Sequence, residues 1–442
     1  MVRLPDSALR ELIERRGDAA RALPAEVETR ARWLVLDTLG CAIAASRSPQ
    51  VQAWLHGHRL RADPYGTAID PGHGPAAGAA MALAMGACWD EACEGHAGAH
   101  GRPGVAVLAA LWPQVSELTL DQLCRALVMG YEVGARMGAV LRIAPGMHVD
   151  GNWPSLGAAA AAAYALGLDS QGILTAVNIA ACQLPTSLYR PITTGDSARN
   201  TYLGHAAMLG QMAADAAAAG ISAPHDAIDE YLRVAYGTTG SPADMSAVDI
   251  FEILSGYVKE YAAVRHVHYG ARAALELRGR APAESIRGIE LWTYEEALTY
   301  CGIRAPATPL QAQFSLSFGV AAMLRWGRLD PDVYVSPLFT DPLMRALERK
   351  VVIHVGPEWA PQHVRAARLR LELAGGDAVE HVITAVRGDA SLPWTESELT
   401  AKFVRYCAGS LSAEQAAALA RHILHAPPQA AVFPNVVFPN AR

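Results

Sequence analysis

The sequence has no excess of positive charge. Its 37 Lys and Arg residues stand against 43 Asp and Glu residues, which gives a formal net charge of -6. A chain without a general basic field does not hold nucleic acid or an anionic membrane surface through charge alone. We therefore expect neither as a partner, and any anionic ligand requires a local cationic pocket.

The sequence also has no long apolar run of the kind that crosses a membrane. Charged residues interrupt the first 32 residues repeatedly, unlike the apolar core of a signal peptide. Long low-charge runs, such as Leu156 to Leu168, consist mainly of Ala and Gly, which is typical of packed soluble helices. Its seven cysteines are odd in number and form no CxxC pair. These features predict a cytoplasmic, reduced protein.

Sequence motifs of cofactor-binding sites are missing too. There is no GxGxxG followed by an acid, no GxxxxGK[ST] and no HExxH. These absences argue against a bound dinucleotide, a P-loop nucleotide and a catalytic zinc ion. Glu94, His96 and His100 are metal-ligand types, but no other His/Cys pair has ligand spacing. We expect no metal and no cofactor.

The composition is that of a folded protein with a large core. The 442 residues are 51% hydrophobic and 18% charged, which indicates two domains or one large helical body with an insertion. Apolar residues recur at helical spacing up to about Tyr261. This spacing predicts helices over Ser7–Arg21, Ala25–Ala45, Gly74–Glu91, Leu120–Leu141, Ser155–Leu166, Ser170–Cys182 and Asn200–Ala219.

The pattern changes after about Arg280. Short alternating or β-branched runs, SIRGIELWTY, KVVIHVG and RAARLRLELAGG, predict strands of a smaller α/β domain. Helical spacing returns from Thr395. We expect a helical domain over residues 1–258, an α/β domain over 259–395, and C-terminal helices over 396–442 that pack back on the helical domain. The predicted fold class is mainly α.

The densest group of polar side chains lies in the Gly-rich stretch Trp89–Gly104. Its glycines make a regular helix doubtful, so a loop is expected. In such a loop Asp90 or Glu94 can orient His96 or His100 for proton transfer. A solvated turn without function is the alternative.

A second group precedes the helix that begins near Ser155. His148 and Asp150 stand just before this helix, where free backbone N–H groups favour an anionic ligand. The alternative is an ordinary loop histidine with Ser155 as a helix cap.

Two further groups are basic. Arg199 can clamp a carboxylate through two hydrogen bonds or pair with Asp196 at the surface. Lys259, Arg265 and His268 lie where the helical pattern gives way to the α/β pattern. A cleft is common at such a domain junction.

The order of these motifs resembles the MmgE/PrpD family, which includes 2-methylcitrate dehydratase, cis-aconitate decarboxylase and iminodisuccinate epimerase. The resemblance runs nearly end to end. It is carried by LDTLGCAIA, WDEACEGHAGAHGRPG, GYEVGARMG, RNTYLGHAAMLG, KEYAAVRHVH and AQFSLSFGVAAML.

This resemblance implies a large helical domain built from both chain ends, a smaller α/β lid domain, a homodimer and a cofactor-free cleft. Asp90 matches the first acid of the family's loop and His100 its loop histidine. His148 matches the second histidine, Arg199 a position usually lysine or arginine, and Lys259 the lysine at the junction.

Four positions depart from the family pattern. Glu94 stands where a threonine is usual, and Asp150 where a threonine follows the second histidine. Val264 replaces a frequent histidine or cysteine, and Phe318 replaces the tyrosine of decarboxylase-like members. Two proton-transfer groups are thereby lost and two acids gained.

The family's chemistry starts at a C–H bond beside a carboxylate or carbonyl, so a base needs cations that stabilise the developing enolate. The resemblance implies His100 as the main acid/base, oriented by Asp90, with His148 as a second proton-transfer group. Arg199 and Lys259 become carboxylate or enolate clamps. The other expected substrate contacts are Glu94, His96, Asp150, Arg265, His268 and Phe318.

Three functions stay open at this point. The first is a cofactor-independent lyase of the dehydratase type acting on a small hydroxy-carboxylate. The second is an isomerase, epimerase or cyclase for a substrate with an amine or imine, with Glu94 and Asp150 as counter-charges. The third is a binding protein that has lost the chemistry of the Val264 and Phe318 positions.

Overall fold

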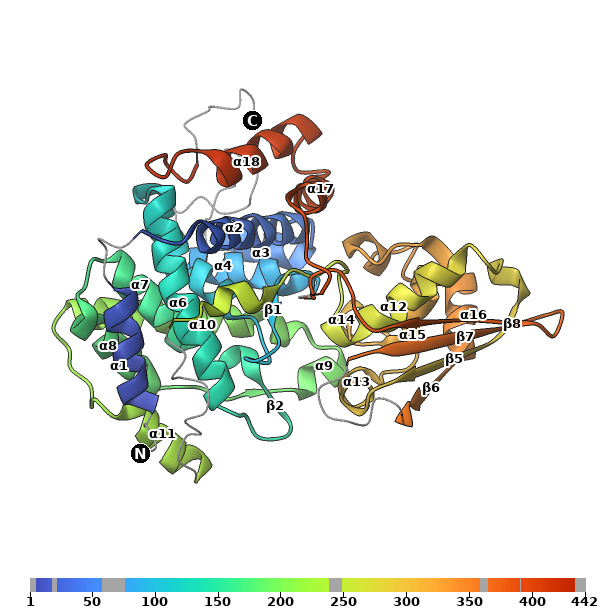
Figure 1. Ribbon diagram of the computed structural model, residues 1–442, viewed down its shortest axis with the longest axis horizontal. Coiled ribbons are helices and arrows are strands. Elements are labelled where there is room, and N and C mark those ends of the chain that lie inside the picture. The colour runs from blue at the N-terminus through green and yellow to red at the C-terminus, as the bar shows by residue number, and fades with distance from the viewer. Residues whose placement is uncertain are drawn as a thin grey trace.

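The computed structural model describes residues 5–17, 22–57, 76–237, 249–357, 365–389 and 391–433. Across these residues the chain forms a large helical domain and a smaller α/β lid domain that lie side by side (Figure 1). The mainly α fold class is thereby confirmed. The predicted helix ends at Arg21 and Gly74 lie outside the described residues.

Helices make up almost all of the helical domain. They are α1 (Pro5–Arg16), α2 (Ala25–Ala45), α3 (Pro49–Gly57), α4 (Ala76–Trp89), α5 (Pro103–Leu111), α6 (Leu120–Val140), α7 (Pro154–Ala165), α8 (Ser170–Ala181), α9 (Arg190–Thr194), α10 (Tyr202–Ala218), α11 (Ala227–Tyr236), α17 (Glu396–Cys407) and α18 (Ala413–His425). Short 3₁₀ segments add η1 (Trp112–Glu117), η2 (Val149–Gly151), η3 (Ser197–Thr201) and η4 (Glu252–Ser255). None of the described helices is long and apolar enough to cross a membrane.

Small residues let the central helices α6, α7 and α10 approach one another closely. The run Ala158 to Ala163 of α7 is buried throughout. A Cβ atom added to Gly130 of α6 would lie 2.5 Å from the carbonyl oxygen of Gly157 in α7, and one on Gly157 would lie 2.6 Å from that of Gly130. Glycine at both positions is what permits this backbone contact.

The lid domain is built on a four-stranded mixed sheet in the order β6-β5-β7-β8. Strand β5 pairs parallel with β6 and antiparallel with β7, which pairs antiparallel with β8. Helices α12, α15 and α16 lie together on one side of the sheet (Figure 1). The elements are α12 (Arg265–Arg278), η5 (Ala283–Ser285), β5 (Ile286–Thr293), α13 (Glu295–Cys301), α14 (Pro309–Gln313), α15 (Leu316–Trp326), η6 (Pro331–Tyr334), α16 (Pro342–Lys350), β6 (Val351–Val355), β7 (Ala367–Leu373) and β8 (Ala378–Ile383).

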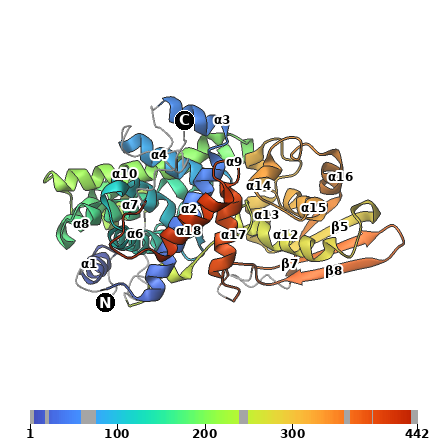
Figure 2. The same cartoon turned by 90° about the horizontal axis from the view of Figure 1, so that it is seen from above.

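The last two helices return to the helical domain and pack against α2 (Figure 2). The buried Nζ of Lys402 in α17 donates to Oδ1 of Asp37 at 2.5 Å and to the carbonyl of Ala92 at 2.8 Å. Arg32 of α2 donates to the carbonyl of Ile423 in α18 at 2.9 Å. The helical domain is therefore built from both chain ends.

Candidate active site

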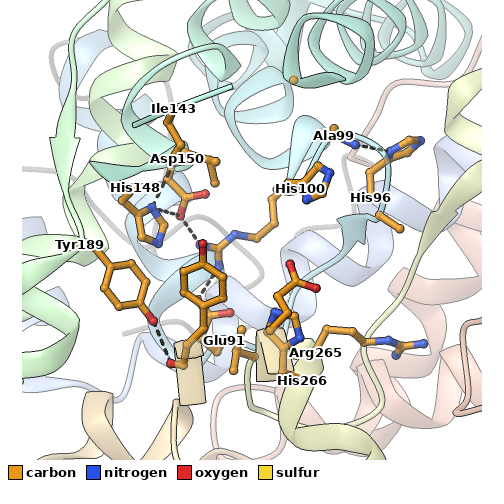
Figure 3. A pocket seen from close by; sticks show the side chains of 18 of the residues that line it. Glu91, His96, Ala99, His100, Ile143, His148, Asp150, Tyr189, Arg265 and His266 are labelled. Atoms are coloured by element: carbon orange, nitrogen blue, oxygen red, sulfur yellow. Dashed lines mark hydrogen bonds and ion pairs between the residues drawn. The ribbon is translucent and has the colours of Figure 1, made fainter. Parts of the chain in front are cut away.

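A cavity of about 310 Å³ lies where the two domains meet. The helical domain contributes the loop after α4, the segment before α7 and η3. The lid contributes the start of α12, α13 and Phe314. His148, Asp150 and Tyr189 lie on one side of this cavity, while Arg265 and His266 lie on the other (Figure 3).

A two-residue sheet fixes the loop after α4 against the domain junction. Strand β1 (Gly95–His96) pairs antiparallel with β4 (Gly256–Tyr257). The His96 N–H donates to the Gly101 carbonyl at 2.8 Å, closing a short turn that carries His100. Lys259 follows β4 by two residues, so this pairing brings the lysine to the loop.

A second two-residue sheet fixes His148. Strand β2 (Met147–His148) pairs antiparallel with β3 (Ser187–Leu188), and the Ser187 hydroxyl donates to the His148 carbonyl at 2.8 Å. The next residue, Tyr189, stacks its ring on the His148 ring, with centroids 6.0 Å apart.

Glu91 is the centre of a buried charge cluster. Its Oε2 accepts a hydrogen bond from Nζ of Lys259 at 2.7 Å, and its Oε1 accepts one from Nη1 of Arg102 at 2.8 Å. Oε1 also contacts Nη2 of Arg199. Each of these side chains is almost fully buried. One carboxylate thus holds three cations together.

Asp150 is the second acid of the cluster. Its Oδ2 pairs with Nη2 of Arg102 and lies 3.6 Å from Nη2 of Arg199. Its buried Oδ1 has no hydrogen-bond partner among the residues that the structure describes. With two acids and three cations, the cluster keeps an excess of positive charge, which suits an anionic ligand.

Backbone conformation singles out two residues of this cavity. Glu91 and His100 have φ values of 54° and 55°, in the left-handed region that non-glycine residues rarely adopt. The surrounding structure must compensate for such strain, which often occurs at functional sites. Glu91 and His100 both line the cavity.

The site's electrostatics alter its titratable groups. Burial, together with the neighbouring Arg102 and Arg199 cations, lowers the pKa of Lys259 to about 8. Burial also lowers the pKa of His148, so its ring is neutral near pH 7. The Asp150 N–H donates to Nδ1 of His148 at 3.2 Å. The neutral ring therefore carries its hydrogen on Nε2, as a donor.

Seven residues that the sequence suggested line this one cavity: His96, His100, His148, Asp150, Arg199, Lys259 and Arg265. Two of them have their charged or polar ends engaged elsewhere. Nε2 of His96 lies 3.1 Å from Oε2 of Glu252. Arg265 pairs with Asp389.

Two acids of the same loop do not belong to the lining. Asp90 is absent from the lining, and burial raises its pKa to about 7. The charges that act on it are those of Arg47, Asp332 and Asp330. Glu94 accepts a hydrogen bond from the Gly104 N–H at 2.8 Å, and burial raises its pKa to about 8. Glu94 thus faces the N-terminus of α5, not the expected substrate.

His268 and Phe318 also lie outside the lining, because α12 and α15 turn them into the lid core. Nε2 of His268 lies 3.1 Å from the Ala263 carbonyl. The Phe318 ring stacks on Tyr334, with centroids 5.7 Å apart. Both side chains are fully buried.

Sequence reasoning missed Glu91 and Arg102, the two residues that connect the cluster. Glu91 follows Asp90 directly and lines the cavity with a left-handed backbone conformation, which a sequence pattern does not reveal. The sequence does offer a signal for Arg102 as a site residue, because it immediately precedes the helix that begins at Pro103-Gly104 in the same loop. His266 and Tyr189 of the lining were not selected either.

Glu94 and His96, two of the three residues of metal-ligand type in this loop, contact different partners. Glu94 binds the Gly104 N–H, while His96 faces Glu252. Within the described parts of the chain, no group of three His, Cys, Asp or Glu side chains is arranged to hold a metal ion.

A helical domain and an α/β lid that enclose a cationic cleft define the class of protein. Residues 18–242 match the MmgE/PrpD N-terminal domain, and residues 261–425 match the MmgE/PrpD C-terminal domain. The chain belongs to the MmgE/PrpD family.

Two curated relatives resemble the chain over most of its length. One is the cis-aconitate decarboxylase-like protein oryM of Aspergillus oryzae (strain ATCC 42149 / RIB 40), 23% identical over 435 residues, covering 89% of each chain. The other is the cis-aconitate decarboxylase of Aspergillus terreus, 23% identical over 439 residues, covering 89% of this chain and 87% of the relative. Both relatives are named after cis-aconitate decarboxylase.

Proposed function

We propose that this protein is a cofactor-independent lyase that eliminates water from a small hydroxy-carboxylate. The cluster of Lys259, Arg102 and Arg199 around Glu91 is the observation that carries the proposal. A buried group of cations stabilises an enolate, because its charges are already oriented and water does not screen them.

His100 is assigned the removal of the C–H proton. It is exposed at the cavity, on a strained turn, so the proton that it takes can pass to solvent. The C–H electron pair forms the enolate of the adjacent carboxylate, which Arg199 and Arg102 stabilise. His148 adds a neutral N–H donor.

Elimination is completed when the enolate electrons form the C=C bond and the C–O bond of the neighbouring carbon breaks. The leaving hydroxyl requires a proton, and the Lys259 ammonium supplies it. A lysine with a pKa of about 8 releases a proton far more readily than an ordinary lysine. Water leaves, and proton exchange with solvent restores His100 and Lys259.

Asp150 favours a substrate that carries a hydroxyl group. The Asp150 carboxylate lines a cavity whose other charged side chains are mostly cations, so it accepts a hydrogen bond from a substrate hydroxyl.

Decarboxylation is the second candidate, because both curated relatives carry that activity in their names. It needs the same enolate stabilisation, but the bond that breaks is C–C and the leaving group is CO₂. No leaving hydroxyl is then involved.

The test is ¹H NMR of the purified protein with 2-methylcitrate, citrate and cis-aconitate. Dehydration predicts a new vinyl C–H signal from citrate, and from 2-methylcitrate either a vinyl C–H signal or the singlet of a methyl group on the new C=C bond. Decarboxylation predicts a new terminal methylene signal and CO₂ from cis-aconitate. The variant His100→Asn, chosen because Asn tolerates the left-handed backbone, should lower turnover by at least about 100-fold.

His205→Asn is the matched control, since this exposed histidine lies on α10 away from the cavity lining. It should keep wild-type turnover. Turnover of cis-aconitate alone, with a terminal methylene signal and CO₂, would replace dehydration by decarboxylation. Binding of all three acids without turnover would favour the binding-protein hypothesis.

A further inference from the structure

The cavity has an apolar wall that the proposed chemistry does not use. Val264, Tyr189 and Phe314 all line it. The Phe314 ring stands 6.4 Å from the Tyr189 ring, centroid to centroid. Tyr300 extends the wall toward solvent, with its ring 5.5 Å from that of Tyr189.

This wall rests on a small hydrophobic core of its own. Ile192, Leu310 and Phe314 are buried together, and Tyr189 and Val264 pack against them. Ile192 belongs to α9 of the helical domain and Leu310 to α14 of the lid. The wall is thus supported from both domains, which keeps it in place beside the charge cluster.

Tyr189 presents a ring to the cavity without a free hydroxyl donor. Its O–H donates to the Tyr300 carbonyl at 2.9 Å. Burial raises the pKa of this phenol, so it stays neutral. The side chain therefore offers an aromatic surface, not an acid or a base.

The wall and the charge cluster lie in one cavity. Arg199 belongs to the cluster, and its Cζ is 5.7 Å from the centre of the Phe314 ring. The cavity volume of about 310 Å³ is about twice the roughly 150 Å³ of an engineered cavity that binds benzene. There is space for a carboxylate head beside the cations and for an apolar group beside the wall.

We infer that the substrate is a carboxylate with an apolar substituent of up to phenyl size, held by Val264, Tyr189, Phe314 and Tyr300. This inference rests on the proposed function, since the cationic cluster is taken as the site of the carboxylate head. A compact polycarboxylate would leave the wall facing water.

The experiment is isothermal titration of the full chain with succinate, 2-methylsuccinate and 2-benzylsuccinate. These probes share two carboxylates and differ only in the apolar substituent. Affinity should rise along the series, and 2-benzylsuccinate should bind at least about tenfold more tightly than succinate, as expected for burial of a phenyl group.

Val264→Thr keeps the shape of the wall but adds a hydroxyl to it. We expect the ratio of the succinate Kd to the 2-benzylsuccinate Kd to fall at least about threefold. Tyr300→Ser should lower the same ratio, because it removes the exposed ring that extends the wall. Val335→Thr, at an exposed valine outside the lining, is the control and should leave the ratio unchanged.

The outcomes separate the two proposals. If succinate binds and 2-benzylsuccinate binds equally or more weakly, the apolar subsite is refuted while the carboxylate site stands. If none of the three dicarboxylates binds, the proposed function fails and the subsite fails with it. A raised affinity that Val264→Thr and Tyr300→Ser leave intact would also overturn the assigned wall.

Discussion

Nζ of Lys259 lies 2.7 Å from Oε2 of Glu91, although the two residues are 168 positions apart in the chain. Nζ also donates to the Glu91 carbonyl at 3.0 Å. This contact joins the loop after α4 in the helical domain to the junction from which the lid begins. It makes Glu91 the residue that positions the proposed acid.

The first prediction concerns Glu91→Gln. Removing this charge leaves three buried cations without their shared partner, so the free energy of unfolding should fall by about 3 to 5 kcal/mol. The kcat/KM should fall at least about 100-fold. Urea unfolding and steady-state kinetics measure both, with exposed Glu414→Gln as control.

A structural role alone would not change the pH profile of this variant. Loss of the Glu91 carboxylate lowers the pKa of Lys259 further, because the ammonium loses its counter-charge. The alkaline limb of kcat/KM should therefore move to lower pH in Glu91→Gln. An unmoved limb would remove Glu91 as the residue that positions Lys259.

The second prediction concerns Lys259 itself. If its ammonium protonates the leaving hydroxyl, kcat/KM falls as the pH rises through about 8, the pKa of this lysine. Lys259→Arg keeps the charge but does not release a proton at this pH, so kcat should fall at least about 100-fold while KM changes little. A rate that instead rises through pH 8 would make Lys259 a base.

Much of the fold was predictable, because long helices and their capping residues leave a periodic signal in the sequence. The α2, α6 and α8 helices begin within a residue of their predicted starts. The two-residue strands β1 to β4 could not be predicted, since two residues carry no alternation. Yet these strands are what bring His148 and Lys259 into place.

The candidate site was predictable only in part for a similar reason. A pattern identifies a Gly-rich loop, but it does not tell which of two adjacent acids points inward. Asp90 was expected in the site, but its neighbour Glu91, which has a left-handed backbone conformation, lines the cavity instead. Phe318 is turned into the lid core by the register of α15, which depends on packing with Tyr334 and Phe339.

The third prediction tests the placement of Glu94. The pKa of Glu94 in the folded protein is about 8, above the ordinary value of 4.5. Between pH 4.5 and pH 8, Glu94 therefore keeps a proton in the folded protein that it releases in the unfolded protein. That contribution to stability is complete below pH 4.5 and is lost as the pH rises toward 8. Glu94→Gln lacks it.

Urea unfolding at pH 6 and pH 9 checks this sign. Wild-type protein should lose more stability between the two pH values than Glu94→Gln does. At pH 6 the two should differ by less than about 1 kcal/mol, because the amide oxygen still accepts from the Gly104 N–H. The control Glu284→Gln, at an exposed glutamate, should lose as much stability between pH 6 and pH 9 as the wild type. If Glu94→Gln instead abolishes substrate binding, Glu94 belongs to the site after all.

The fourth prediction concerns the return of the chain to α2. Lys402→Met leaves Asp37 buried without its cation and should lower the free energy of unfolding by about 3 to 5 kcal/mol. Adding Asp37→Asn should recover part of this loss. Exposed Arg421→Met on α18 should be nearly neutral. A neutral Lys402→Met would mean that the ion pair does not hold α17 in place.

Deuterium exchange tests the central claim, that the Glu91 cluster stabilises an enolate beside a carboxylate. Wild-type protein is incubated in D₂O with the product acid or a slow substrate, and ¹H and ²H NMR follow the carbon beside the carboxylate. We predict enzyme-dependent deuterium at that carbon, reduced at least about 100-fold in His100→Asn and in Arg199→Met, and unchanged in His205→Asn. Turnover without deuterium at that carbon, or equal exchange in all four proteins, would contradict the account.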